Sequence, residues 1–325
     1  MIKILSVENW EPNRSWSWGL VIQRLIENLP NEYKFIRLRR GQFGCENPKC
    51  HRIFFHPVDI ELCEDFDILF PQNADTIQMI PRAENVVARI GGLDMTNPAT
   101  ERYSKDFERV AHVIATNQQL YDIAVKANPN ATLIANGVDL DHFQPAVPNP
   151  NFDRKFMVGF AGNIWGGGAD YKGWGYYVKA CARLMIDGVE QRYLLHQANQ
   201  IDNLKMPTEF YHLIDALILP SRGEGCSNVV SEALACGVPV LLTKVGFHGE
   251  LLEDGKNCLF IERDEDSIIS AVRRLLNDPD LRTRLAVNGR DFAEQHHDVR
   301  KIAAQYDRVF KSILARTRER KDSKA

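Results

Sequence analysis

Two glutamates, Glu224 and Glu232, stand in the stretch of sequence that says most about chemistry. The stretch Leu219–Val240 has the order strand, glycine-rich turn, helix, turn, strand. Ser227 or Asn228 can cap the helix, whose first backbone N–H groups form a site for an anion. Glu232, about one turn into that helix, can accept two hydrogen bonds from a vicinal diol such as that of a ribose. Each glutamate could instead be an ordinary surface charge.

The elements that must hold these residues alternate between short apolar runs and helical patterns. In the first half we expect strands at 2–7, 34–38, 67–70, 86–90, 113–116 and 131–134 and helices at 20–29 and 117–127. In the second half we expect strands at 156–160, 193–196, 216–219, 238–242 and 258–261 and helices at 175–186, 228–235, 267–276, 281–295 and 298–315. This alternation predicts an α/β fold in which parallel sheets carry helices on both faces.

Three prolines between Gln144 and Asn151 interrupt the alternation, because neither a helix nor an inner strand continues through them. We therefore expect a linker at 144–151 between a first domain at 1–143 and a second at 152–297, followed by a C-terminal segment at 298–325. Two doubly wound domains of similar size would face a central cleft. Ligands of such sheets bind at the carboxyl ends of the strands.

The composition excludes several classes of protein. The 325 residues are 44% hydrophobic and 26% charged, which is typical of globular chains and unlike disordered or collagen-like ones. No apolar run reaches the ~18 residues of a membrane-spanning helix. The apolar start of the chain stops at Glu8, so we expect no secretory signal. The net charge of −3 gives no general attraction to nucleic acid, and we expect a cytoplasmic protein without nucleic-acid partners.

The seven cysteines, an odd number, indicate reduced thiols rather than a disulfide framework. Five potential metal ligands cluster in one segment, namely Cys45, Cys50, His51, His56 and Cys63. Their spacing lacks the second tight pair that zinc sites usually have. We interpret this cluster as a polar loop with free thiols, and a metal site remains the alternative.

Three segments together resemble one family. The glutamates stand inside Pro-Ser-Arg-Gly-Glu and Glu-Ala-Leu-Ala-Cys-Gly-Val-Pro-Val of segment 220–240. Segment 134–145 reads Ile-Ala-Asn-Gly-Val-Asp-Leu-Asp-His-Phe-Gln-Pro, and segment 158–163 reads Val-Gly-Phe-Ala-Gly-Asn, with Lys172-Gly173 following. This combination resembles the retaining glycosyltransferases of the GT-B fold, sequence family four, or glycosyl transferases group 1. The resemblance covers most of 131–295 and implies two Rossmann-like domains. It also implies that the C-terminal helix of 298–325 crosses back to the N-terminal domain and ends in a basic tail.

The resemblance implies roles on the donor side. Glu232 would bind the ribose hydroxyls of a nucleotide, and Glu224 the hydroxyls of the donor sugar. Lys172 would neutralise the diphosphate as it leaves, which stabilises the transition state more than the ground state. No metal and no cofactor would then be needed beyond the nucleotide-sugar itself. Backbone amides would contact sugar and phosphate, and these belong to Gly225, Cys226, Ser227, Asn228 and Val229.

The chain departs from the family pattern at several donor-side positions. Asn163 stands where the family often has an arginine, so one positive charge near the diphosphate is missing. The segment around His196 lacks the usual glycine-rich turn, so the base of the carrier, UDP, GDP or another, is not readable there. His196 could equally be a packed strand-end residue. Gly19, at the start of a predicted helix, could approach a phosphate.

The acceptor side is less readable, and four residues are candidates for it: Trp16, Trp18, Arg89 and Asp94. The tryptophans stand in a polar loop, where aromatic rings could stack on sugar faces or instead anchor the loop in the core. Many relatives have a histidine after the fifth strand, where this chain has none. Arg89 or Asp94 could serve the acceptor there, and a structural cation is the alternative for Arg89.

The resemblance implies a retaining, metal-independent hexosyltransferase (EC 2.4). In its front-face mechanism the leaving phosphate accepts the proton of the acceptor, which is a saccharide, a lipid-linked molecule or another small molecule. The basic segments 36–40 and 316–324 could bring peripheral contact with a membrane, or simply be solvated. The alternative is a catalytically inactive sugar-nucleotide-binding or scaffold subunit. A nicotinamide-dependent oxidoreductase is excluded, because segment 9–19 lacks Gly-x-Gly-x-x-Gly.

Overall fold

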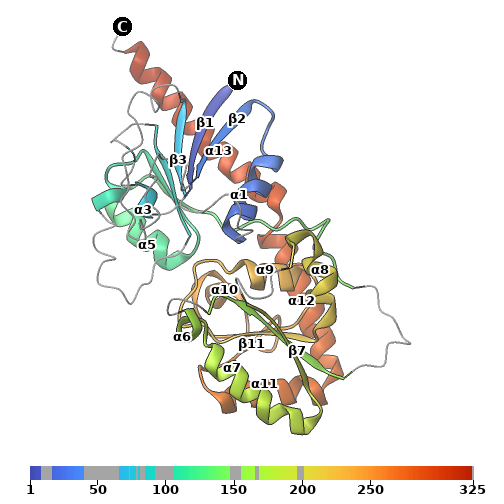
Figure 1. Ribbon diagram of the computed structural model, residues 1–325. Helices are drawn as coiled ribbons and strands as arrows, with labels where there is room; N and C mark the ends of the chain where they lie inside the picture. The colour runs from blue at the N-terminus through green and yellow to red at the C-terminus, as the bar shows by residue number, and fades with distance from the viewer. Residues whose placement is uncertain are drawn as a thin grey trace, which may run out of the picture. The chain divides into compact units, whose positions relative to one another are not determined.

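Figure 1 shows the computed structural model, which describes residues 1–8, 17–39, 66–72, 74–77, 80, 85–91, 105–146, 155–164, 168–195 and 201–323. The chain divides into two compact units: unit 1 holds Met1–Gly137 and Arg300–Ala325, and unit 2 holds Val138–Val299. Each unit combines parallel strands with helices, so the predicted α/β fold class is confirmed. Within the described ranges, no helix is long and apolar enough to cross a membrane.

Over its described residues, unit 1 carries two short parallel sheets. The first has the order β2 (Tyr33–Arg39), β1 (Ile2–Glu8), β3 (Ile68–Pro71), and the second has the order β4 (Val87–Ile90), β5 (His112–Ala115), β6 (Ala131–Leu133). A parallel bridge between Leu69 and Val86 joins the two sheets. Helices α1 (Ser17–Asn28), α3 (Ala74–Ile77) and α5 (Gln118–Ala127) lie between strands in sequence. Every residue of β3, β4 and β5 is buried, as expected for inner strands covered on both faces.

The last helix, α13 (Val299–Asp322), packs against the first sheet of unit 1. The ring of Phe310 meets that of Phe70 in β3 edge to face, with the ring centroids 5.3 Å apart. It lies 5.8 Å from the ring of Tyr33 in β2. The Tyr33 hydroxyl donates to Asp307 Oδ1 at 2.7 Å. These aromatic contacts hold the C-terminal helix to the strands of unit 1.

Unit 2 is built on one parallel sheet with the order β11 (Leu259–Phe260), β10 (Val240–Leu242), β9 (Ala216–Leu219), β7 (Met157–Gly162), β8 (Glu190–Leu195). Its helices are α6 (Gly168–Lys172), α7 (Trp174–Leu184), α8 (Met206–Glu209), α9 (Asn228–Ala235), α10 (Gly246–Leu251), α11 (Glu265–Asn277) and α12 (Pro279–His296). Helices α7 and α11 lie side by side in Figure 1. Their apolar faces and the central strands form one buried core.

The strand order of unit 2 decides where its loops meet. Strand β7 has β8 on one side and β9 on the other, so the winding of the chain reverses between β7 and β9. Open α/β sheets bind ligands at such a point, outside the carboxyl ends of the strands. Helix α6 follows β7, and the loop 220–227 follows β9. Both segments therefore leave the sheet at the position that the topology favours for a ligand.

The chain enters unit 2 earlier than the predicted linker. Val138 forms a parallel bridge with Asp298, and its N–H donates to the carbonyl of His297 at 2.7 Å. Phe143 is fully buried, and its ring centroid lies 6.0 Å from that of Tyr211. Residues 138–143, which we expected in the first domain, therefore belong to unit 2. A backbone bridge and aromatic packing over long sequence distances set this boundary, and a count of prolines does not reveal them.

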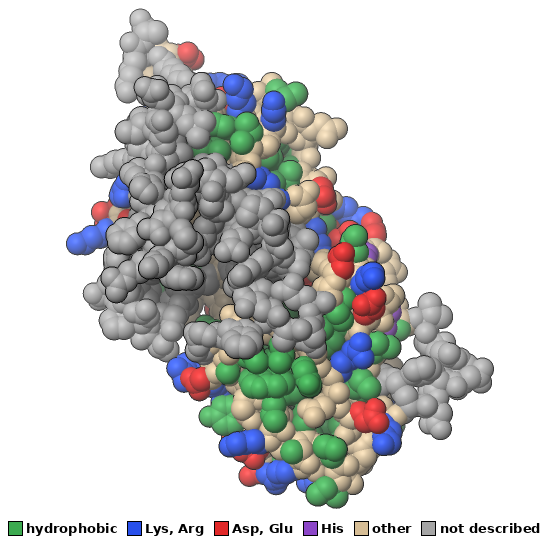
Figure 2. All heavy atoms as spheres, viewed as in Figure 1, with side chains coloured by type: hydrophobic (Ala, Val, Ile, Leu, Met, Phe, Trp, Pro, Cys, Tyr) green, Lys and Arg blue, Asp and Glu red, His purple; other side chains and the backbone are tan. Residues whose placement is uncertain are grey.

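The surface of unit 2 mixes charges of both signs. In Figure 2, acidic and basic side chains lie next to one another over this unit. Two ion pairs link α7 to α11: Arg183 Nη1 lies 2.6 Å from Asp266 Oδ1, and Lys179 Nζ lies 3.2 Å from Glu265 Oε1. Exposed pairs of this kind contribute at most ~1 kcal/mol each, so the apolar core dominates the stability of the unit.

Candidate functional site

The segments that follow β7 and β9 lie directly against each other in unit 2. The N–H of Arg222 donates to the carbonyl of Tyr171 at 2.7 Å. Gly173 has a left-handed backbone with φ of +71°, and a Cβ there would stand 2.2 Å from the carbonyl oxygen of Pro220. Only glycine fits both conditions. The Lys172-Gly173 pair in the sequence thus has a structural reason. The glycine lets the end of α6, which carries Lys172, pack closely against the loop after β9.

This approach brings two of the predicted residues into contact. Lys172 Nζ lies 2.6 Å from Glu224 Oε1, and the two side chains are 23% and 12% exposed. The hydroxyl of Ser221 donates to the same oxygen at 2.7 Å. The pair is therefore well shielded from water without being closed off. A lysine has three donors, so Lys172 can keep Glu224 and still reach a second anion.

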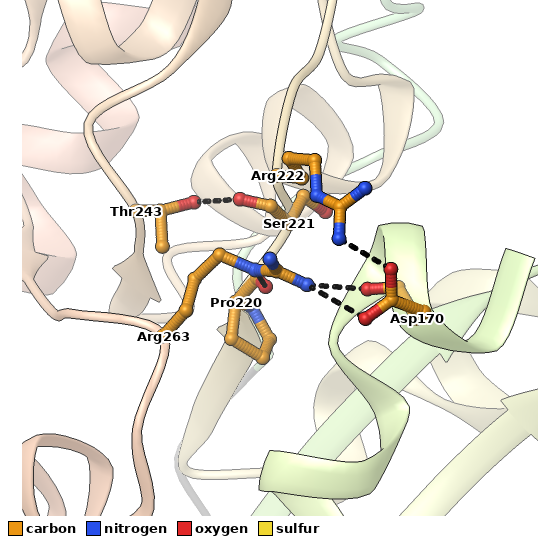
Figure 3. Close-up of polar contacts among 6 residues, drawn as sticks. All are labelled: Asp170, Pro220, Ser221, Arg222, Thr243 and Arg263. Atoms are coloured by element: carbon orange, nitrogen blue, oxygen red, sulfur yellow. Dashed lines mark hydrogen bonds and ion pairs between the residues drawn. The ribbon is translucent and has the colours of Figure 1, made fainter. Parts of the chain in front are cut away.

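An acidic residue of α6 anchors the lysine helix to the loop, as Figure 3 shows. Asp170 Oδ2 accepts from Arg222 Nη2 at 2.5 Å, and Asp170 Oδ1 lies 3.8 Å from Arg263 Nη2. The Arg263 Nη2 also donates to the carbonyl of Asp170, while its Nε donates to the carbonyl of Pro220 at 3.1 Å. Asp170 thus contacts two arginines, Arg222 in the loop after β9 and Arg263 in the segment after β11. These contacts hold α6, and with it the ammonium of Lys172, in place.

Three contacts from the segment after β10 support the loop that carries Glu224. Gly246 has φ of +61°, and a Cβ there would stand 2.4 Å from the carbonyl oxygen of Glu224. The N–H of Phe247, in α10, donates to the carbonyl of Gly225 at 2.8 Å. The hydroxyl of Thr243 donates to the carbonyl of Ser221 at 2.6 Å, as Figure 3 shows. The backbone around Glu224 is therefore held by hydrogen bonds from the segment after β10.

Glu232 lies on α9 and is only 5% exposed. The hydroxyl of Tyr211 donates to its Oε2 at 2.9 Å, and Asn203 Nδ2 donates to its Oε1 at 3.5 Å. Interpreting Glu232 as an ordinary surface charge is therefore wrong. The sequence did not identify Tyr211 and Asn203 as its partners, because they lie 21 and 29 residues away and no local spacing links them to α9.

The other donor-side residues surround the same loop. Ser227 is the N-cap of α9 and makes no side-chain hydrogen bond to the first turn, whose N–H groups have no acceptor within the helix. Cys226 is buried, and Val229 accepts at its carbonyl from the Tyr211 hydroxyl at 3.4 Å. Asn163 directly follows β7, and a Cβ on Gly168 would stand 2.5 Å from its carbonyl oxygen. The first turn of α9 can therefore present backbone amides to an anion.

Arg89 is the one acceptor candidate whose side chain the structure describes. It lies on β4 and is 1% exposed. Its Nε donates to the hydroxyl of Tyr306 at 3.1 Å, and its Nη2 donates to Asn136 Oδ1. These contacts favour the structural cation over a contact with an acceptor, because the guanidinium is used inside the core of unit 1.

Several predicted residues lie outside the described residues. Trp16, Asp94, His196 and the cluster at 45–63 belong to this group. Trp18 and Gly19 fall in α1, of which the structure gives the backbone at these positions. Their assigned roles stay predictions.

Comparison with known proteins points to one family. Residues 186–292 match the family model described as Glycosyl transferases group 1. The uncharacterized glycosyltransferase MJ1178 of Methanocaldococcus jannaschii is 38% identical over 80 residues, which are 24% of this chain and 23% of that protein. The capsular polysaccharide biosynthesis glycosyltransferase CapM of Staphylococcus aureus is 27% identical over 132 residues, 40% of this chain and 35% of that protein. The alignments thus span about a quarter to a third of these relatives.

Two solved structures match over nearly the whole chain. Anabaena Alr3699/HepE in complex with UDP-glucose superposes with a TM-score of 0.72 at 15% identity, covering 96% of this chain and 100% of that chain. Sucrose-phosphate synthase (tll1590) from Thermosynechococcus elongatus gives a TM-score of 0.71 at 16% identity, covering 97% and 100%. At such identities the similarity shows the fold, which is GT-B as predicted.

Proposed function

We propose that this chain, whose residues 186–292 form a glycosyl transferases group 1 domain within a GT-B fold, is a retaining glycosyltransferase of sequence family four. It transfers a sugar from a nucleotide-sugar to an acceptor. The observation that carries the proposal is the shielded pair of Lys172 and Glu224, 2.6 Å apart, at the carboxyl ends of the two central strands of unit 2. Helix α9 begins beside this pair and carries the buried Glu232.

The proposed chemistry follows from charge development. Breaking the bond between the sugar and the diphosphate builds negative charge on the leaving phosphate. Lys172, held by Asp170 through α6, supplies an ammonium that need not reorganise, and the first-turn amides of α9 add partial positive charge. These groups stabilise the transition state more than the ground state. The reaction therefore needs no metal at the diphosphate.

The two glutamates would divide the recognition of the donor. Glu224, near the loop surface, would accept hydrogen bonds from the hydroxyls of the sugar. Glu232, whose two oxygens already accept from Tyr211 and Asn203, has lone pairs left for the ribose hydroxyls. Retention at the anomeric carbon would follow a front-face path, in which the leaving phosphate accepts the proton of the acceptor. No carboxylate nucleophile is then required.

UDP-glucose is the first donor to test, because Alr3699/HepE, which shares the fold, is solved with UDP-glucose. The acceptor is a saccharide or a lipid-linked molecule, and a saccharide fits the relative named for capsular polysaccharide biosynthesis. A cytoplasmic enzyme with peripheral contact with a membrane through the basic C-terminal residues would suit a lipid-linked acceptor.

The test pairs binding with turnover. Thermal shifts with UDP-, GDP-, ADP- and dTDP-sugars identify the carrier, since a ligand of the folded state raises the melting temperature. Release of the nucleoside diphosphate, with an acceptor panel and with or without added Mg²⁺ or Mn²⁺, then measures transfer and its metal dependence. We expect Glu224→Gln to lower kcat on the order of 10²-fold while the carrier still binds.

The matched control is Glu253→Gln. Glu253 also pairs with a lysine, Lys256, at 2.6 Å, but the two side chains are 61% and 59% exposed. This variant should keep the wild-type rate. Binding without turnover in the wild type, over all donors and acceptors tried, would favour the inactive sugar-nucleotide-binding subunit. Rates that rise steeply with Mg²⁺ would contradict metal independence.

A further inference from the structure

Three soft metal ligands converge in the interior of unit 2. The Sγ of Cys226 and one ring nitrogen each of His248 and His297 all lie within 4.8 Å of one another. The two Nε2 atoms are 3.2 Å apart. The three side chains are 5%, 1% and 0% exposed. The donor chemistry uses only the backbone amide of Cys226, and neither it nor the family comparison gives these three side chains a role.

The three ligands come from three different elements. Cys226 stands in the loop before α9, His248 lies on α10, and His297 follows the last residue of α12. The hydroxyl oxygen of Ser231, on α9, lies 3.1 Å from the Nε2 of His248 and 3.4 Å from that of His297. The Ser231 hydroxyl oxygen is thus close enough to both nitrogens to serve as a fourth ligand.

The spacing fits a tetrahedral ion. Zinc binds histidine nitrogen at ~2.0–2.1 Å, so two such nitrogens in a tetrahedral shell are about 3.3 Å apart. The observed 3.2 Å between the His248 and His297 nitrogens needs almost no adjustment. A zinc–thiolate bond is ~2.3 Å long, which places sulfur and nitrogen about 3.6 Å apart, within the 4.8 Å limit of the cluster.

The surroundings suit neutral imidazoles and exclude water. The imidazoles of His248 and His297 are 1% and 0% exposed, and such burial disfavours the charged form of a ring. A neutral ring keeps a lone pair for a metal. The ring of Phe247 lies 5.3 Å from that of His297, and Phe292 lies 5.8 Å from it. Such an apolar shell strengthens the attraction between a thiolate and a divalent cation.

We propose that Cys226, His248 and His297 bind a structural zinc-type ion, with the hydroxyl of Ser231 as the fourth ligand. The ion would join the loop that carries Glu224 to α10 and to the end of α12. His297 also accepts the backbone hydrogen bond of Val138, where the chain enters unit 2. The ion is distinct from one at the diphosphate, and the proposal does not rest on the proposed function.

A hydrogen-bonded cluster without metal is the competing account. The Ser231 hydroxyl lies 3.0 Å from the carbonyl of Ser227 and donates to it. Its oxygen can then accept from one imidazole N–H. This arrangement holds the two rings together by hydrogen bonds alone. It differs from the proposal in one measurable respect, which is that the purified chain would hold no ion.

The test measures metal in the full chain. The protein is purified without a histidine tag, washed briefly with chelator and analysed by mass spectrometry of the elements. We expect about one zinc per chain. After exhaustive stripping and addition of Co²⁺, we expect the visible bands of four-coordinate cobalt and a thiolate charge-transfer band. Cys226→Ala should abolish the charge-transfer band, and His297→Phe should lower the zinc content at least tenfold.

Two control variants separate this site from other thiols. Cys181→Ala removes another buried thiol of unit 2, which is 2% exposed and lies in the core of α7 and the sheet. Cys181→Ala should destabilise unit 2 to a degree similar to Cys226→Ala, but the protein should keep its zinc. Cys50→Ala tests the cluster at 45–63.

The outcomes are exclusive. A wild-type chain without zinc and without cobalt bands would overturn the proposal in favour of the hydrogen-bonded cluster. Zinc that falls with Cys50→Ala and persists with Cys226→Ala would place the ion in the other segment and equally overturn it. Because the readouts are metal content and a spectrum, they do not depend on finding the donor or the acceptor.

Discussion

Buried polar side chains serve different ends in the two units. In unit 1, Arg89 donates to Tyr306 and Asn136 inside the core, so its charge links strand β4 to helix α13. In unit 2, the shielded Lys172 and Glu224 meet on segments that follow the two central strands, next to the start of α9. The first arrangement holds elements together, and the second presents groups where a ligand can reach them.

This contrast teaches that burial of a charge is by itself a poor marker of a site. Arg89 is more buried than Lys172, at 1% against 23% exposed. What distinguishes Lys172 is its place on α6, which follows the central strand β7, and its contact with Glu224 in the loop that leads into α9. The family match also falls on unit 2, at residues 186–292.

The largest expected effect is on turnover. Lys172→Met removes the ammonium that we place at the leaving diphosphate, so kcat should fall ~10²–10³-fold with the carrier still bound. Lys256→Met is the control, because Lys256 pairs with Glu253 at the same 2.6 Å but is 59% exposed. Steady-state kinetics of nucleotide release decide the matter. An unchanged kcat in Lys172→Met would contradict the functional role that we assign to Lys172 in unit 2.

The next effect is on stability and concerns unit 1. Arg89→Met leaves the Asn136 oxygen and the Tyr306 hydroxyl buried without this donor, which should lower the free energy of unfolding by roughly 2–4 kcal/mol. Urea unfolding measures it, with Arg192→Met as control, since the half-buried Arg192 makes a solvent-exposed hydrogen bond to the carbonyl of Glu209. Donor affinity should stay constant. Normal stability combined with a loss of acceptor affinity would instead restore the acceptor role.

The sequence predicted the alternation of strands and helices well, because inner parallel strands are continuous apolar runs. It also placed Glu224, Lys172 and the start of α9 on neighbouring segments through the family resemblance. It did not predict that Glu232 is buried against Tyr211, which is 21 residues away. Such contacts depend on the tertiary path of the chain, and no local spacing encodes them.

Unit boundaries and glycine roles were harder to predict for the same reason. The prolines of 144–151 predicted a linker, yet the bridge of Val138 with Asp298 already places 138–143 in unit 2. Gly173 looked like part of a lysine motif, and only the structure shows its left-handed φ and its approach to Pro220. A positive φ at one glycine among 21 leaves no trace in composition.

A smaller effect is expected on nucleotide binding in unit 2. Glu232→Gln keeps the shape of the side chain and removes its charge, so the carrier nucleotide should bind about 10–100-fold more weakly, the range for hydrogen bonds to charged groups. Isothermal titration of the nucleoside diphosphate measures it. Glu209→Gln is the control, because Glu209 forms an exposed pair with Lys205 in the same unit. Equal affinity in wild type and Glu232→Gln would contradict the ribose contact.

The smallest effect is a dependence of stability on pH that originates in unit 1. Burial, and after it Arg316, lowers the pKa of His112 from 6.5 to about 4, and its Nε2 lies 2.9 Å from the Thr132 hydroxyl. Among the described residues, its Nδ1 has no hydrogen-bond partner, so a second proton would be buried without an acceptor. Between these two pKa values the unfolded chain binds more protons than the folded one. Stability is therefore full above pH ~6.5 and falls as the pH falls toward ~4.

The loss should amount to about 1–2 kcal/mol between pH 7 and pH 5. Urea unfolding of wild type and His112→Gln over this range isolates it, because the variant cannot titrate at this position. His248 in unit 2 shifts in the same direction, so a residual slope in the variant is expected. Parallel pH profiles for the two proteins would show that His112 is not held neutral. That result would contradict the view that the buried polar groups of unit 1, such as His112, contribute to its stability.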